Sequence, residues 1–214
     1  IFATAGLQGS RDRIADAAAQ KAGTPDAILL DAGNSLHGTP MASMTGGMDM
    51  MSAFSAAGYD LQAVSLWDMA YGTSRLLSDA NMAAGPTIAS NLQDGSGTPV
   101  LYRSTSWHRN KVTDGQTAVI ERAGYKIGFF SVNAAADTVF TTSNTEVFAA
   151  ADFAENAAKQ IDTLQKQGVD AIVCIACAAP ADSSWQKTLL KQGVDAIITT
   201  AATADNDRVL AAGL

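Results

Sequence analysis

The chain has 214 residues, of which 47% are hydrophobic, so it can bury a sizeable core in one large domain or two small ones. Its 21 acidic residues outnumber its 14 basic ones, and the net charge of −7 argues against a nucleic-acid surface, which needs clustered Lys and Arg. No run of about 18 apolar residues predicts a membrane span, and the opening residues IFATAG lack the charged and apolar regions of a signal peptide.

Strand-like and helix-like segments alternate over the first half of the chain. Apolar runs predict strands at residues 1–7, 26–33, 61–66 and 85–91. Helix-like runs occupy residues 11–21, 48–57 and 73–82, and Gly58 is a plausible C-cap for the second of them. The methionines between Met41 and Met51 are typical of core filling. Alternation of this kind predicts a sheet of parallel strands covered by helices.

The middle of the chain changes character. Three strand-like segments follow one another at residues 99–107, 117–124 and 125–133, and Ala123-Gly124 predicts a hairpin turn between the last two. These segments indicate an antiparallel portion of the fold. The six residues QGVDAI then occur twice, at 167–172 and 192–197. We interpret each copy as a helix end, a glycine cap and a buried strand.

The two cysteines, Cys174 and Cys177, have the C-x-x-C spacing of redox pairs. Such pairs usually lie where a strand gives way to a helix, whereas Cys174 lies inside an apolar run. In a continuous strand, residues three apart point to opposite faces, so a disulfide would need a bend. One C-x-x-C also supplies only half of a structural zinc site. Two small core residues and a thiol pair both remain possible interpretations.

The motifs read, in order, TAGLQG, LLDAGNSLHGTP, GYDLQAVSLWDMAYG, TIASN, YKIGFFSVN, GVDAIVCIACAA and GVDAIITTAATA. This series resembles the N-terminal metallophosphatase domain of the 5′-nucleotidase family, within the calcineurin-like phosphoesterases, as far as about Ala204. The resemblance implies an α/β fold: a two-sheet sandwich flanked by helices, with mixed parallel and antiparallel strands, forming a single domain over residues 1–214. It also implies a periplasmic or extracellular protein. Family members usually carry a C-terminal domain that holds the nucleotide base, and we expect it to be absent from this chain.

The family's loops carry a two-metal site, and the resemblance places other residues at the corresponding positions. D-x-H-G aligns with residues 6–9, G-D with 33–34, G-N-H-E with 65–68, the ligand His with Cys177, and G-H-x-H with 200–203. Neither His37 nor His108 aligns with a ligand. We therefore expect a vestigial pocket without metal or cofactor. Its expected residues are Gly6, Gln8, Asn34, Leu66, Trp67, Asp68, Cys177, Ala201 and Thr203.

Hard carboxylate and imidazole ligands are what a dinuclear site requires. Asn34 offers one neutral oxygen, Leu66 cannot coordinate, and the indole of Trp67 cannot protonate a leaving group at neutral pH. The leading hypothesis is therefore a catalytically inactive domain, a pseudoenzyme that binds a protein partner or acts as a scaffold in a larger protein or complex.

Three alternatives stay open. The first is an enzyme with thiol chemistry at Cys177, and the second is residual phosphoesterase activity. The third is a metal-free site for a small ligand, built from Asn34, Trp67 and the loop amides. Asp68 stands at the family's Glu position, where it could act as a lone base or cap the helix that follows.

Overall fold

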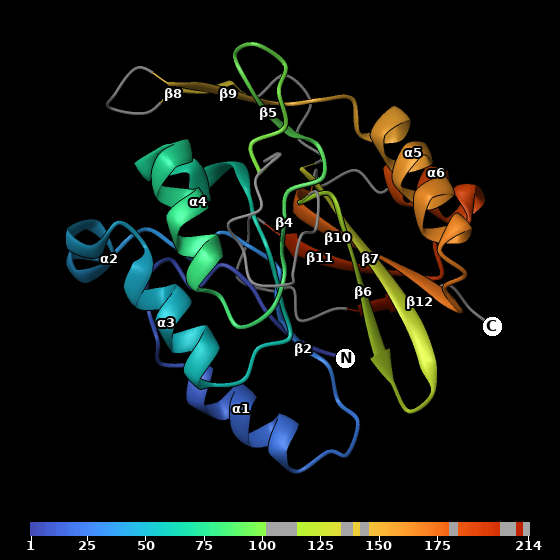
Figure 1. Cartoon of the computed structure of the whole chain (residues 1–214), viewed down its shortest axis with the longest axis horizontal. Coiled ribbons are helices and arrows are strands. Elements are labelled where there is room, and N and C mark those ends of the chain that lie inside the picture. Colours follow the sequence, from blue (N-terminus) through green and yellow to red (C-terminus); the bar gives the residue numbers. More distant parts are fainter. Residues whose placement is uncertain (102–114, 134–138, 142–145, 180–183, 202–208, 212–214) are drawn as a thin grey trace.

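Two facing β-sheets with helices on their outer sides form the body of the molecule (Figure 1). The computed structural model describes residues 1–101, 115–133, 139–141, 146–179, 184–201 and 209–211. Within these ranges the architecture is an α/β sandwich with both parallel and antiparallel pairs, as the sequence predicts.

The first sheet is parallel throughout, in the order β1-β2-β3-β4. Its helices α1, α3 and α4 lie together on one side in Figure 1. The strands are β1 (Phe2–Thr4), β2 (Leu29–Asp31), β3 (Leu61–Ala63) and β4 (Thr87–Ile88), and the helices are α1 (Ile14–Ala22), α3 (Met48–Ala56) and α4 (Thr73–Met82).

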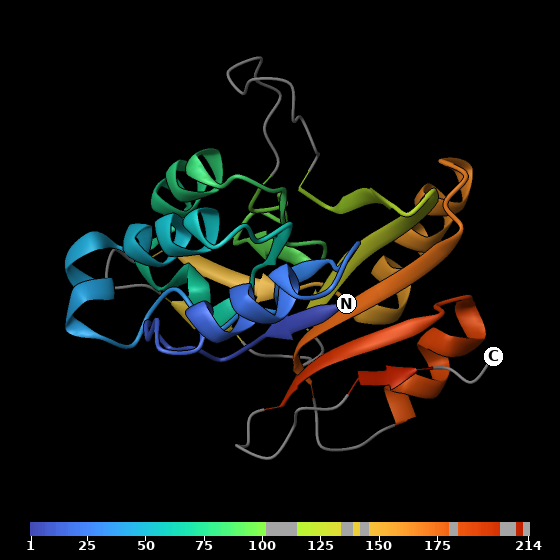
Figure 2. The same ribbon diagram turned by 90° about the horizontal axis from the view of Figure 1, so that it is seen from below.

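The second sheet has the order β12-β11-β10-β7-β6, with a parallel centre and an antiparallel strand at each edge. The hairpin between β6 and β7 turns at Ala123 and Gly124, whose φ angles of 51° and 84° are both left-handed, as a two-residue hairpin turn requires. Helices α5 and α6 pack on its outer face (Figure 2). The elements are β6 (Thr117–Arg122), β7 (Tyr125–Asn133), β10 (Ala171–Ala179), β11 (Ala196–Ala201), β12 (Val209–Ala211), α5 (Phe153–Lys166) and α6 (Ser184–Gln192).

A third, small antiparallel sheet was not predicted. It has the order β5-β9-β8, formed by β5 (Leu92–Asp94), β8 (Val139–Thr141) and β9 (Val147–Ala150). In the predicted strand at 99–107, Pro99 makes a single bridge to Gln93, and residues 102–107 lie outside the described residues. The antiparallel portion therefore combines the predicted hairpin with a second, longer-range pairing.

Two further differences concern the first half. A short helix α2 (Pro40–Thr45) begins where the Thr39 side chain accepts a hydrogen bond from Ala42 N, and it ends at Gly46 in the left-handed region. Its side chains Met41 and Met44 are exposed, which corrects the prediction of core filling there, although Met50 and Met51 on α3 are buried. The predicted strand at 61–66 stops at Ala63, and Leu66 begins a 3₁₀ helix, η1 (Leu66–Tyr71).

The Asp of each G-V-D motif caps the start of a neighbouring strand. Each Asp accepts a hydrogen bond from the backbone N–H that opens the neighbouring parallel strand, Asp170 from Lys126 N at 2.7 Å and Asp195 from Ile172 N at 2.7 Å. Asp60 of the G-Y-D segment does the same for Leu29 N at 2.9 Å. Such bonds satisfy strand-end donors that the sheet leaves unpaired. The motif thus fixes the amino ends of both sheets.

Candidate functional site

The loops that follow β1 and β2 are joined backbone to backbone at the carboxyl ends of the strands, where α/β folds place their ligands. The N–H groups of residues 6–9 all donate to the facing loop. This corrects the expectation that loop amides are available to a small ligand here. The pairs are Gly6 N to Gly33 O at 2.9 Å, Leu7 N to Ser35 Oγ at 3.3 Å, Gln8 N to Asn34 O at 3.1 Å and Gly9 N to Ser35 O at 2.9 Å.

These two loops hold an uncommon backbone conformation. Gln8 and Asn34 have φ angles of 47° and 60°, in the left-handed region that few residues other than glycine adopt. A Cβ at Gly38 would lie 2.5 Å from the backbone oxygen of Gln8, so the loops approach as closely as a glycine allows. The conformation therefore depends on many bonds that act together.

Asp68 is the residue that holds the loops together. Its carboxylate is 4% exposed and accepts from three consecutive N–H groups of the second loop, those of Asn34 at 2.7 Å, Ser35 at 2.8 Å and Leu36 at 2.8 Å. It also accepts from Ser65 N and Ser65 Oγ, both at 2.9 Å. The carboxylate therefore caps its own 3₁₀ helix, as in a capping box, instead of the later helix α4. With five donors on two oxygens, it is poorly placed to act as a base.

A pair of asparagines ties the second sheet to this assembly. Asn133, at the end of β7, accepts from Leu66 N at 2.9 Å and donates to Val64 O at 3.2 Å. Asn91 accepts from Asn133 N at 2.7 Å and donates to Asn133 O at 3.0 Å. Neither residue was predicted as a site residue, although TIASN and FFSVN each end a strand-like run in asparagine.

Beneath the loops lies a buried carboxyl group that was also not predicted as a site residue. Asp31, at the end of β2, is 2% exposed and accepts from Thr4 Oγ1 at 2.7 Å, Ser35 Oγ at 3.0 Å and Gly33 N at 3.0 Å. The Tyr59 hydroxyl lies 3.1 Å from Thr4 Oγ1 and extends the network. All of its direct partners are neutral.

Burial is the main reason that Asp31 holds its proton. It raises the pKa of this carboxyl to about 8, and the nearby Asp68 charge acts in the same direction. The hydrogen bonds from Thr4, Gly33 and Ser35 oppose the shift without cancelling it. Burial likewise raises the pKa of Tyr59 to about 12. Asp31 is therefore neutral at pH 7.

Both cysteines are free and buried, on opposite faces of β10. Cys177 packs between the two sheets and donates its S–H to Ala32 O at 3.2 Å, while Cys174 packs under α5 and α6. Burial raises the pKa of both thiols, and for Cys177 the carboxyls of Asp68 and Asp31 raise it further. A buried thiol whose acidic neighbours among the described residues are carboxyl groups is a poor nucleophile. This geometry argues against thiol chemistry at Cys177.

A thiol-specific reagent tests this placement. At pH 7.5, native protein is expected to react far more slowly than protein in concentrated urea, where both thiols become accessible and titrate as two per chain. Cys177→Ser and Cys174→Ser, each measured alone, assign the residual reactivity. Rapid labelling of native protein that disappears in Cys177→Ser would restore the thiol alternative.

No family model matches the chain, and no curated protein matches it. Among solved structures, the calcineurin-like phosphoesterase YfkN from Bacillus subtilis is 15% identical with a TM-score of 0.66 over 92% of this chain and 70% of that one. The chain has the calcineurin-like phosphoesterase fold. A 5′-nucleotidase precursor from Thermus thermophilus is 20% identical, with a TM-score of 0.64 over 88% of this chain, and the NAD nucleotidase NadN from Haemophilus influenzae is 16% identical, with a TM-score of 0.64 over 94%. The chain spans 35% and 34% of those two nucleotidase chains.

The residues predicted to line the vestigial pocket differ in their exposure to solvent. Gly6 and Gln8 are exposed, Asn34 is half-buried, and Trp67 is 44% exposed on η1. The other three with described side chains, Leu66, Asp68 and Cys177, are buried, so Cys177 does not project into an open pocket. Ala201 pairs with Ala179 at the ends of β11 and β10. Thr203 and His108 lie outside the described residues, and His37 Nε2 lies 2.9 Å from Asn34 Oδ1.

The residues present do not fit the two-metal centre that a phosphoesterase fold can carry. Among the described residues, no three His, Cys, Asp or Glu side chains lie where they could share a metal ion. The carboxylate of Asp68 is fully used by N–H and O–H donors, and the carboxyl group of Asp31 is bonded to Thr4, Gly33 and Ser35. Asn34 offers a single amide oxygen, which already faces His37. We therefore derive no chemical step through a metal.

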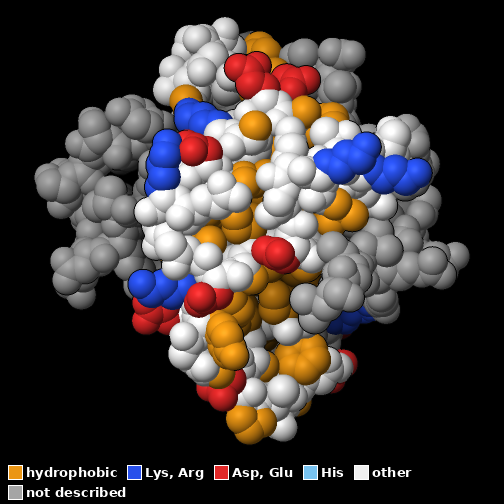
Figure 3. All heavy atoms as spheres, turned by 90° about the vertical axis from the view of Figure 1, so that its right-hand side faces the viewer, with side chains coloured by type: hydrophobic (Ala, Val, Ile, Leu, Met, Phe, Trp, Pro, Cys, Tyr) orange, Lys and Arg blue, Asp and Glu red, His pale blue; other side chains and the backbone are white. Residues whose placement is uncertain are grey.

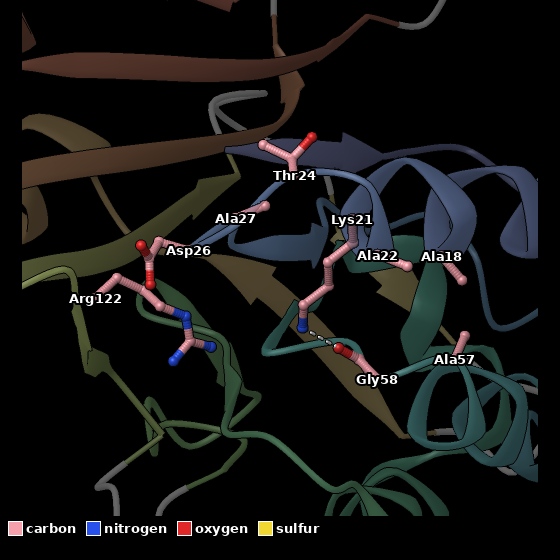
Figure 4. Close-up of a pocket in the computed structure, with 9 residues that line it drawn as sticks. All are labelled: Ala18, Lys21, Ala22, Thr24, Asp26, Ala27, Ala57, Gly58 and Arg122. Carbon is pink, nitrogen blue, oxygen red and sulfur yellow. Dashed lines mark hydrogen bonds between the residues drawn. The ribbon is translucent and has the colours of Figure 1, made fainter.

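A separate hollow lies at the opposite, amino end of the strands (Figure 4). It has a volume of about 470 Å³, and its two cations, Lys21 and Arg122, both pair with Asp60. Figure 4 shows Lys21 reaching Gly58, whose carbonyl oxygen it meets at 2.5 Å. Asp60 thus bridges the two cations, and these contacts tie α1 and β6 to the residues just before β3.

The described surface agrees with the charge balance of the sequence. On the face shown in Figure 3, acidic and basic side chains are interspersed among apolar ones, and the described residues form no continuous basic patch there. No helix in the described ranges combines the length and apolar composition that a membrane crossing requires.

Proposed function

We propose that this domain is a catalytically inactive member of the phosphoesterase fold that serves as a binding or scaffold module. The observation that carries the proposal is the use of Asp68: at the strand ends, a carboxylate organises backbone N–H groups of the facing loop. The loops are thus supported by the chain's own hydrogen bonds.

The chemistry of the residues at the family's ligand and catalytic positions supports the same conclusion. Metal-assisted phosphoester hydrolysis needs ions that activate water and neutralise the developing charge. Leu66 is buried and has no donor atom, and the Trp67 indole cannot act as a general acid at neutral pH. Losing one preorganised electrostatic group typically costs about 100- to 1,000-fold in rate. These losses act on one site together, so we do not multiply them.

A protein partner or a further domain is the proposed occupant of the strand-end surface. Trp67 is 44% exposed beside the loops, and exposed aromatic residues are enriched in protein interfaces. The resemblance to a nucleotidase precursor supports a periplasmic or extracellular location within a larger protein or complex. Binding of a small ligand at Gln8, Asn34 and Trp67 is the second candidate, because these side chains are at least partly accessible.

Hydrolysis assays test the proposal. Purified protein should hydrolyse a nucleotide monophosphate and a bis-ester reporter at background rates, with or without added Mn²⁺ or Zn²⁺. Asn34→Ala and Trp67→Ala separate a contaminant from a native site, because a contaminant's rate is unchanged by either substitution. An enzyme-like rate that falls in both variants would overturn the proposal.

A further inference from the structure

Four buried polar side chains form a row across the first sheet. Thr4 is in register with Asp31, Asp31 with Gln62, and Gln62 with Thr87, so the row crosses all four strands. Alternate residues of a strand point to opposite faces. The neighbours Leu30, Leu61, Ala63 and Ile88 pack between the two sheets, so the polar row faces the helix layer of α1, α3 and α4.

The two halves of this row differ. Thr4 and Asp31 are hydrogen-bonded to each other and to their surroundings. Gln62 and Thr87 are more than nine-tenths buried, yet within the described part of the chain neither amide atom of Gln62 nor Thr87 Oγ1 has a hydrogen-bond partner. The side chains lie next to each other on the same face.

A sheet face that is buried under helices is ordinarily more stable with apolar side chains than with unpaired polar ones. Methionine and valine have nearly the shapes of Gln62 and Thr87 and would avoid the desolvation penalty of three unpaired polar atoms. Buried polar groups in folded proteins are paired with protein atoms or ordered water. Adjacent strands lie about 4.8 Å apart, close enough for two side chains to share one water, which makes about three hydrogen bonds.

We propose that Gln62 and Thr87 form a binding site for a buried water molecule between the first sheet and its helices. The water molecule forms a hydrogen bond with each of these two side chains. It also extends the row of hydrogen-bonded groups from Gln62 toward Asp31. Asp31 Oδ1 accepts from Gly33 N and retains capacity for a further donor. The four side chains then form one hydrogen-bonded network beneath the strand-end loops.

Melting temperatures test the proposal through the sign of the change. Gln62→Met and Thr87→Val alone should each lower the melting temperature by roughly 2–4 °C, because each leaves the water with one partner fewer. The double variant should recover most of the loss, because both partners are then apolar. Thr4→Val, which removes a hydroxyl bonded to Asp31, is the matched control and should lower it too. If both single variants raise the melting temperature additively, the site is dry and the proposal is wrong.

A crystal structure of the unmodified protein decides the matter even where a variant fails to fold. Density for a water within hydrogen-bond distance of Gln62 and Thr87 would support the site. A direct hydrogen bond between these two side chains, or a packed space without density, would overturn it.

Discussion

Replacing Asp68 with Asn is expected to lower the free energy of unfolding by about 3–5 kcal/mol, which is a large fraction of a typical domain's stability. The carboxylate accepts five hydrogen bonds, four of them from backbone N–H groups. An Asn side chain replaces one accepting oxygen with an NH₂ group that faces these donors. The loops would lose the bonds that hold their left-handed backbone.

Asp152 provides a graded control for this substitution. Its side chain caps α5 by accepting from Glu155 N at 2.8 Å, at an exposed position. Asp152→Ala should cost about 1 kcal/mol, the usual value for an N-cap. Urea unfolding followed by circular dichroism gives both values. If Asp68→Asn costs no more than Asp152→Ala, Asp68 does not organise the loops as described.

The stability of the protein should fall as the pH rises from about 6 to 8, and Asp31→Asn should remove most of this fall. Burial raises the pKa of Asp31 to about 8, whereas the unfolded carboxyl titrates near its ordinary value of 3.8. Between these values the folded chain holds a proton that the unfolded chain has released, so the free energy of unfolding decreases with increasing pH. One pKa unit corresponds to about 1.4 kcal/mol. The expected loss over this window is therefore on the order of 2 kcal/mol.

A second buried carboxyl separates this effect from general titration. Burial raises the pKa of Asp79 to about 6, with Arg75 opposing the shift, so Asp79 contributes at lower pH. Urea midpoints between pH 5 and 8.5 should show that Asp79→Asn keeps the decline from 6 to 8 and Asp31→Asn loses it. An equal decline in the unmodified protein and Asp31→Asn would show that Asp31 is ionised in the folded state.

Periodicity and turn chemistry predicted the main helices and the hairpin, whereas the two-sheet sandwich was predicted from the family resemblance. Helix α4 begins at Thr73 and ends at Met82, as the sequence predicts, and the hairpin turn falls at Ala123-Gly124. The third sheet was missed because β5, β8 and β9 are short and because β5 pairs with a strand far along the chain, β9. Helix α2 was missed although Thr39-Pro40 and Gly46 are recognisable start and stop signals.

Less of the candidate site than of the fold could be predicted from the sequence. Ser65 and Asp68 have the S-x-x-D spacing of a capping box, which predicts a local cap. The spacing does not reveal that the same carboxylate receives three N–H groups from residues more than 30 positions earlier. The roles of Asp31 and Cys177 depend on their burial, which the sequence does not show. Asp31 looks like an ordinary strand end and Cys177 like a pocket residue, yet both are enclosed between layers.

A metal titration tests most directly whether the strand-end loops are supported by the chain's own hydrogen bonds. Untagged protein is melted with and without Mn²⁺ or Zn²⁺, because an ion that binds only the folded state stabilises it by about 2.7 kcal/mol at 100 times its dissociation constant. We expect metal to shift the melting temperature of the unmodified protein no more than it shifts those of Gln8→Ala and Asn34→Ala. Calorimetry should show no stoichiometric heat of metal binding. A saturating rise with one or two ions per chain that disappears in both variants would contradict the account.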